Sequence, residues 1–347
     1  MSDAVPDFTP VHLITGFLGS GKTTLLQRLL RDPALANTAV LINEFGEVGL
    51  DHQLLERIDE TMVLLQSGCL CCTIRGELSD AIRALHERRE AGAIPAFQRL
   101  VIESTGLADP FPILSTLQAD PVLKHHFRLG NVITTIDAVN AGGQFDRQPE
   151  SVKQVAVADC LMLTKAEMAE ADSVAALTAR IRQINPAAPL WQTSDRIDAE
   201  SLLAHGPFEA TSKADAMRLW TGHGANGAHA HHQNRNRHGD DIRAFCMVFD
   251  QALDWTVFGV WLTMLLHCHG TAILRVKGIL DVAGTSPPVA VHGVQHLVHP
   301  PTHMAAWPDA TRNSRLVFIV KGLEPALIER SLRAFTGVPA AWAPAMA

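Results

Sequence analysis

Residues 11–24 read VHLITGFLGSGKTT, and this stretch determines how the chain begins to fold. A short apolar run ends at a glycine, and a segment with helical spacing, residues 25–30, follows it. The pattern G-x-x-x-x-G-K-[ST] is matched by Gly16, Gly21, Lys22 and Thr23. In such a loop, glycines turn backbone N–H groups inward as an anion cradle, and the positive helix N-terminus adds to the attraction. A plain glycine-rich turn is the competing interpretation, but it leaves Lys22 and Thr23 unexplained.

The loop therefore predicts a bound nucleotide. Lys22 would reach the β- and γ-phosphate oxygens, and the Thr23 hydroxyl would hold Mg²⁺. The residues expected to contact the nucleotide here are Gly16, Gly19, Ser20, Gly21, Lys22, Thr23 and Thr24.

Length and composition indicate an ordinary globular chain of more than one domain. It has 347 residues, of which 47% are hydrophobic and 19% charged, enough to bury a substantial core. A net charge of −7 without a basic block argues against nucleic-acid or anionic-membrane partners. The first ten residues carry acids and proline rather than a signal sequence, and the most apolar stretch, residues 257–266, is too short to cross a bilayer. A cytoplasmic protein is expected.

Apolar runs alternate with helical spacing through the first two thirds of the chain, which favours an α/β P-loop domain with a mostly parallel sheet. The expected strands beyond the first are residues 39–42, 61–65, 99–102, 132–136, 160–163 and 190–193. We place this domain at residues 1–215 and a histidine-rich linker at 216–241. Residues 242–347 are expected to form a smaller α+β domain. In it, two helices, residues 255–267 and 325–335, would pack against one sheet.

Glu103 ends an apolar strand in the sequence LVIESTGLADP, where a Walker B acid belongs. An acid at the carboxyl end of a strand beside the P-loop can hold a Mg²⁺-bound water or orient the attacking water. A helix-capping carboxylate is the alternative for Glu103. Lys22 and Glu103 are thus the candidate catalytic residues. Gly106 could bring its N–H to the γ-phosphate, and Asp109 is expected to cap the next helix.

Residues 43–51, NEFGEVGLD, lie between the P-loop and Glu103, where nucleotide switches place a loop that responds to the γ-phosphate. Glu44, Glu47 and Asp51 are its candidate acids, although acids in a loop are usually only solvated. Of these, Glu47 and Asp51 are the candidate metal ligands.

Thr164, Lys165, Ala166 and Glu167 occupy the place of the guanine-reading motif N/T-K-x-D. An acid at its last position accepts hydrogen bonds from guanine N1–H and N2–H₂, while the lysine stem covers the base. Glu167 is one methylene longer than aspartate. A surface helix start is the competing interpretation.

Cys69, Cys71 and Cys72 are the most distinctive feature of the sequence. Three thiolates select Zn²⁺, Cu(I) or related ions and leave a fourth position for water, Glu47, a histidine or a client ligand. Buried core thiols are the alternative, and we expect that role for Cys160, Cys246 and Cys268. The linker contains five histidines: His223, His229, His231, His232 and His238. They could hold Zn²⁺, Ni²⁺ or Co²⁺ loosely, or they could serve only as polar spacers.

Taken in order, GFLGSGKTTLL, NEFGEVGLD, SGCLCCTIRGEL, ESTGLADP and LTKAE resemble the CobW-type metallochaperone GTPases, relatives of the urease and hydrogenase accessory GTPases. The tail segments GTAILRVKGIL, HGVQH and SRLVFIVKG extend the resemblance over nearly the whole chain. It implies GTP and Mg²⁺ binding, Zn²⁺ or Co²⁺ at the Cys-x-Cys-Cys thiols, and delivery to a client metalloenzyme. Glu167 stands where the family usually has aspartate.

The expected function is accordingly a GTP-dependent metallochaperone with slow basal hydrolysis that a client accelerates. We expect a monomer or weak homo-oligomer. Within this class, cobalt handling for cobalamin synthesis and activation of a nitrile-hydratase-like enzyme stay open beside zinc delivery. Two other classes also remain: a P-loop kinase with a structural zinc, and a metal store indifferent to nucleotide.

Overall fold

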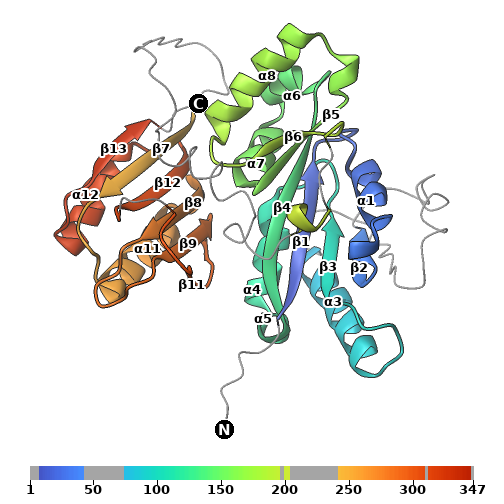
Figure 1. Ribbon diagram of the computed structural model, residues 1–347, viewed down its shortest axis with the longest axis horizontal. Helices are drawn as coiled ribbons and strands as arrows, with labels where there is room; N and C mark the ends of the chain where they lie inside the picture. The colour runs from blue at the N-terminus through green and yellow to red at the C-terminus, as the bar shows by residue number, and fades with distance from the viewer. Residues whose placement is uncertain (1–7, 43–73, 196–198, 204–240, 309–311, 345–347) are drawn as a thin grey trace. The chain divides into compact units, whose positions relative to one another are not determined.

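The computed structural model describes residues 8–42, 74–195, 199–203, 241–308 and 312–344, and the chain divides into two compact units (Figure 1). The first unit comprises Met1–Val139, Ala158–Met168 and Leu190–Ala210. The second unit comprises Asn140–Val157, Ala169–Pro189 and Thr211–Ala347. The strand expected at 61–65, the loop at 43–51, the thiols at 69–72 and the linker histidines lie outside the described residues.

The first unit is built on a parallel sheet, which confirms the predicted α/β fold class. Its six described strands lie in the order β2-β3-β1-β4-β5-β6, and every neighbouring pair is parallel. Strands β1, β2 and β5 are buried at every residue, as in sheets covered on both faces. The strands are β1 (Thr9–Gly16), β2 (Thr38–Ile42), β3 (Arg99–Glu103), β4 (Phe127–Asp137), β5 (Cys160–Thr164) and β6 (Leu190–Gln192).

Helix α1 (Lys22–Leu30) covers one face of this sheet. Its Leu25, Leu26 and Leu29 are buried in one apolar cluster with Ile14 and Val101 of the strands. The other described α-helices of this unit are α3 (Ile74–Glu90), α4 (Pro110–Ala119), α5 (Pro121–His126) and the short α9 (Ala199–Leu202). Helix α3 packs against α4, and α4 and α5 contact β4. Burial of such faces is the main source of helix stability here.

Two aspartates begin the helices that follow β3. Asp109 accepts a hydrogen bond from the Phe111 N–H at 3.0 Å, so its predicted capping role is confirmed. Asp120 caps α5, a helix that the sequence analysis did not predict. Its carboxylate also accepts hydrogen bonds from the side chains of Ser79 and Arg83. Burial raises the pKa of Asp120, but the hydrogen bonds from Ser79 and Arg83 outweigh it and lower the pKa to about 2.

The carboxyl ends of the parallel strands define one edge of the sheet, which we call the carboxyl edge. In the strand register, Ile14 lies opposite Glu103, Gly16 opposite Thr135, and Asp137 opposite Thr164. Open α/β sheets bind their ligands outside this edge. The register therefore gathers the P-loop, the end of β3 and the end of β5 in one place.

The second unit contains an antiparallel sheet backed by two helices, as predicted. Phe258 and Trp261 of α11 and Leu332 of α12 share one core with Phe245 and Phe318 of the strands. The described helices and strands around this core are α11 (Trp255–His269), α12 (Pro325–Thr336), β7 (Ile242–Phe249), β8 (Ile273–Leu280), β9 (Val289–Val294), β10 (Leu297–Val298), β11 (Thr302–His303), β12 (Ser314–Lys321) and β13 (Ala341–Pro344).

Helices α6 (Ala141–Arg147), α7 (Pro149–Val157) and α8 (Ala171–Ile184) group with this sheet in the second unit. The buried Arg275 of β8 donates a hydrogen bond to the Val157 carbonyl at the end of α7. Asn185, just after α8, donates to the Val155 carbonyl at 2.8 Å. Among the described helices, none is long and apolar enough to cross a membrane.

The three described cysteines differ in burial. Cys160 is buried, and Cys246 is partly buried, with burial raising the pKa of its thiol to about 11. Cys268 is exposed on α11, so its predicted core role is wrong. Helix α11 exposes apolar side chains such as Val260 and Met264 on its outer face, and apolar content therefore did not mark its buried side.

Candidate nucleotide-binding site

The P-loop leads from β1 into α1 through glycines in conformations that other residues avoid. Gly16, Gly19 and Gly21 all have positive φ angles, and Gly21 is the N-cap of α1. Within the described residues no side chain caps this helix, so the first turn of α1 is open to an acceptor supplied by a ligand. A Cβ on Gly16 would lie 2.4 Å from the Thr135 carbonyl oxygen, so the loop can leave β1 only at glycine. This is the anion cradle that the motif predicts.

The loop is tied to the neighbouring strand ends. Hydroxyls of Ser20 and Thr135 lie 2.6 Å apart, and the Ser20 N–H donates to the Phe17 carbonyl at 3.1 Å. Lys22, which is buried, donates from Nζ to the same Phe17 carbonyl at 3.2 Å. Thr135 belongs to no sequence motif, and only the register of β4 beside β1 brings it here.

Thr23 and Glu103 meet at the end of β3, where the sequence predicted an acid beside the P-loop. The Thr23 hydroxyl donates to Oε1 of Glu103 at 2.7 Å, and Glu103 is only 3% exposed. A hydroxyl beside a carboxylate is the oxygen donor set that Mg²⁺ prefers, so these residues fit the cation that accompanies a nucleoside triphosphate. Ser104, the next residue, donates its hydroxyl to the Thr15 hydroxyl at 2.9 Å and its N–H to the Ile14 carbonyl.

Gly106 lies against the P-loop backbone. A Cβ at this position would come within 2.5 Å of the Leu18 nitrogen and 2.7 Å of the Leu18 Cα. The segment after Glu103 therefore approaches the loop as closely as a glycine allows, in keeping with the predicted role of Gly106 beside the phosphates.

The predicted base-reading residues begin at the end of β5. Thr164 is buried, and its hydroxyl donates to the Ser20 carbonyl at 2.8 Å. Lys165 has a positive φ of 58° and donates from Nζ to the Gly19 carbonyl at 2.8 Å. Its ammonium also contacts Oδ2 of Asp137 at 2.7 Å. Glu167 is exposed within the short 3₁₀ helix η2 (Ala166–Met168), where a base could reach it.

Most of the predicted nucleotide residues thus come together at the carboxyl edge. Sequence reasoning missed Thr135 and Asp137, because each depends on strand register. The predicted metal ligands Cys69, Cys71, Cys72, Glu47 and Asp51 lie outside the described residues. Within the described part of the chain, no group of three or more His, Cys, Asp or Glu side chains could hold a metal ion.

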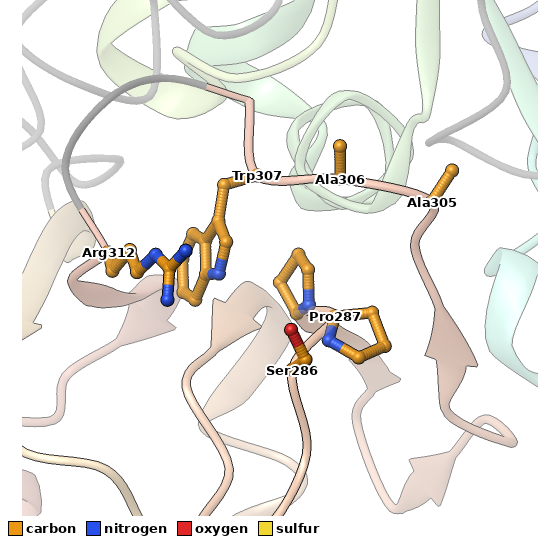
Figure 2. A pocket seen from close by; sticks show the side chains of 7 residues that line it. Ser286, Pro287, Ala305, Ala306, Trp307 and Arg312 are labelled. Carbon is orange, nitrogen blue, oxygen red and sulfur yellow. The ribbon is translucent and has the colours of Figure 1, made fainter.

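A separate pocket of about 550 Å³ lies in the second unit. Trp307 points toward its interior in Figure 2. Its lining residues are Ser286, Pro287, Pro288, Ala305, Ala306, Trp307 and Arg312. Polar and apolar atoms both contribute to the lining, and none of the predicted nucleotide-contacting residues belongs to it.

A glycine cradle at a helix N-terminus, a threonine-carboxylate pair at the next strand and a T-K-x-E loop define a P-loop protein of the guanine-nucleotide-binding kind. Comparisons with known proteins agree. The family described as CobW/HypB/UreG, nucleotide-binding domain, matches residues 10–192, and the cobalamin synthesis protein cobW C-terminal domain matches residues 242–336.

The zinc chaperone YjiA of Escherichia coli (strain K12) is 34% identical over 331 residues, covering 94% of this chain and 98% of its own. The zinc-regulated GTPase metalloprotein activator 1 of Schizosaccharomyces pombe is 34% identical over 200 residues, covering 55% of this chain and 47% of its own. A crystal structure of Zn(II)-bound YjiA GTPase from E. coli is 28% identical and covers 94% of this chain and 99% of its own, with a TM-score of 0.68. The chain therefore belongs to the CobW/HypB/UreG family of P-loop GTPases.

Proposed function

We propose that this GTPase is a metallochaperone that carries Zn(II), with Co(II) as an alternative cargo, to a client metalloenzyme. The names of its relatives support both the metal and the delivery role, since one is a zinc chaperone and another a zinc-regulated GTPase metalloprotein activator. The proposed cargo ligands are the thiols of Cys69, Cys71 and Cys72, a thiolate set suited to zinc. Glu47 and Asp51 are the proposed carboxylate contributors.

One observation carries the proposal. Strand β2 ends at Ile42, which lies opposite Glu103 in the sheet register. Glu103 in turn holds the Thr23 hydroxyl. The acids and the thiols belong to residues 43–73. The chain enters this segment directly after Ile42, at the carboxyl edge and beside the pair of Thr23 and Glu103 that we propose to hold Mg²⁺. A metal-binding segment that starts at the nucleotide site can respond to the γ-phosphate, as switch segments do.

The geometry at the carboxyl edge supports the proposed nucleotide contacts. Lys22 and the N-terminus of α1 would bind the phosphates, and Thr23 and Glu103 would hold Mg²⁺, which supplies charge neutralisation when bound. Lys165 would cover the base, and Glu167 would accept hydrogen bonds from its Watson–Crick edge. Both GTP and GDP would therefore bind.

The remaining parts of the proposal concern organisation. We assign residues 1–215 to the GTPase domain, 216–241 to the histidine-rich linker and 242–347 to the C-terminal domain. We propose a cytoplasmic monomer or weak homo-oligomer whose partner is the client protein, with neither nucleic acid nor membrane as a partner.

Zinc affinity measured by chelator competition tests the proposal. The protein is held first with Mg·GDP and then with a non-hydrolysable Mg·GTP analogue. We expect the affinity for zinc to change about tenfold between the two states. Cys71→Ala should abolish the tight site. Cys268→Ala is the matched control, because Cys268 is an exposed thiol on α11 of the second unit, and it should change nothing.

Equal zinc affinity in both nucleotide states would contradict the proposal. A tight site that survives Cys71→Ala would also contradict it, because the thiol segment would then not be the cargo site. Transfer of the γ-phosphate to an acceptor other than water would favour a kinase instead.

A further inference from the structure

The ammonium group of Lys165 lies where three segments of the first unit meet. It donates to the Gly19 carbonyl of the P-loop at 2.8 Å and to Oδ2 of Asp137 at 2.7 Å. Gly19 follows β1, Asp137 ends β4, and Lys165 follows β5. One side chain thus joins the phosphate-binding loop to the base-reading loop.

Asp137 is itself held rigidly. It is 2% exposed, and its Oδ1 accepts a hydrogen bond from the Val139 N–H at 2.8 Å. Asp137 lies opposite Thr164 in the sheet register, and the Ala138 N–H donates to the Thr164 carbonyl at 2.9 Å. The carboxylate therefore has one oxygen fixed by its own turn and the other directed at Lys165.

Lys165 needs such a partner more than an ordinary lysine does. Its φ of 58° is in the left-handed region, which is unfavourable for a residue with a Cβ. Its side chain is 36% exposed and has a flexible four-carbon stem. Because a charge-assisted hydrogen bond is directional, the buried carboxylate fixes where the ammonium ends and hence how the stem lies.

We infer that Asp137 is a positioning residue for guanine-nucleotide binding. Through Lys165 it holds the base-covering stem and the Gly19 carbonyl of the P-loop in one arrangement, so that base and phosphates meet preformed partners. The inference rests on the guanine-nucleotide site of the proposed function. In this role Asp137 acts through the lysine and not by binding the nucleotide itself.

The position of this contact predicts a distinctive kinetic pattern. In the proposed site, the contacts of the base and of the P-loop backbone would be the same with GTP, with GDP and in the transition state, whereas Thr23 and Glu103 would face the metal and the γ-phosphate. When a variant loses an interaction that is equally strong in the bound substrate and in the transition state, KM rises and kcat is unchanged. Asp137→Asn should therefore weaken GDP and the GTP analogue by the same factor, about 10-fold to 100-fold. Its kcat at saturating GTP should stay within about twofold of the native value.

The experiment is a double-mutant cycle read by fluorescent GDP binding. Lys165→Met keeps most of the stem but removes the ammonium. If Asp137 acts through Lys165, the double variant binds GDP no more weakly than Lys165→Met alone. Asp146→Asn is the matched control, because Asp146 pairs with Arg180 at 2.8 Å on the second unit. It should bind GDP like the native chain.

Three outcomes would overturn the inference: Asp137→Asn affinity within about twofold of native, additive losses in the double variant, or a fall in kcat with unchanged KM. Should Asp137→Asn not fold, Asp137→Ser replaces it in the cycle, since a serine hydroxyl can still accept the Val139 N–H. The same GDP-binding loss is expected of it.

This test separates the inference from the proposed function. A native chain that binds GDP no better than ADP would refute the guanine site and the inference with it. A native chain that binds GDP normally but shows zinc affinity independent of nucleotide would refute the metallochaperone and leave the role of Asp137 standing.

Discussion

The close approach of Gly106 to the P-loop gives a quantitative prediction for catalysis. In Gly106→Ala, the new Cβ would lie 2.5 Å from the Leu18 nitrogen, whereas tolerated Cβ contacts begin at 3.0 to 3.4 Å. The two backbones must therefore separate by about 0.5 to 0.9 Å, the difference between those distances. The φ of Gly106 is outside the left-handed range, so alanine would cause no backbone strain there. The only cost of the substitution is the steric clash with Leu18.

A displacement of this size in a phosphate-binding loop costs catalysis more than it costs folding. Misplacement of reacting groups by about 1 Å can lower the rate about 100-fold. We expect kcat/KM for GTP hydrolysis to fall about 30-fold to 100-fold, with a thermal midpoint within a few degrees of native. Steady-state phosphate release measures the first quantity, and circular dichroism the second.

Gly142→Ala provides the matched control for this prediction. Gly142 lies in α6, has an ordinary φ, and no atom lies within 4 Å of a Cβ added there. Alanine there should leave hydrolysis unchanged and stabilise the helix slightly. If Gly106→Ala kept native kcat/KM, the segment after Glu103 would not touch the catalytic loop as described, and the reasoning would be refuted.

Contacts of three carboxylates give the remaining predictions. Glu103→Gln should lower GTP hydrolysis about 100-fold in a single-turnover assay while GDP still binds, because the carboxylate proposed to hold Mg²⁺ is lost. Native turnover would exclude this role. Asp120→Ala should lower the free energy of unfolding by about 2 kcal/mol at pH 7, as measured by urea titration. The pKa of Asp120 is lower in the folded state, so its ionised carboxylate stabilises the fold, and the partial exposure of its partner Arg83 moderates this effect. That difference should persist above the unfolded pKa of 3.8 and disappear as pH falls toward about 2; a constant difference would contradict it. Glu167→Ala should reduce the preference for GDP over ADP about tenfold or more in competition binding, and an unchanged preference would remove Glu167 from base reading.

The features that sequence could predict are those encoded locally. The P-loop glycines, Lys22 and Thr23 form a contiguous pattern, and Glu103 stands at the end of an apolar run. In a parallel sheet, such ends share one edge, so their proximity followed from the fold class. The pairing of Thr23 with Glu103 at 2.7 Å is the detail that the structure adds.

The features that sequence missed depend on register or on very short segments. Asp137 reaches Lys165 only because β4 and β5 align and Lys165 takes a left-handed conformation, and neither fact is visible in the residues around Asp137. Helix α5 has six residues, too few to show a helical period. Strands β10 and β11 have two residues each, too few to show an alternating strand pattern. Cys268 was misassigned because α11 is apolar on its outer face as well.

The central claim is that nucleotide and cargo zinc bind as one linked system. Linkage requires that zinc change the affinity for the GTP analogue by the same factor by which the analogue changes the affinity for zinc. The most direct measurement is the dissociation constant of a fluorescent GTP analogue, determined on zinc-loaded and zinc-free protein. The account predicts a ratio of about tenfold that disappears in Cys71→Ala. Identical constants for the zinc-loaded and zinc-free protein would contradict it.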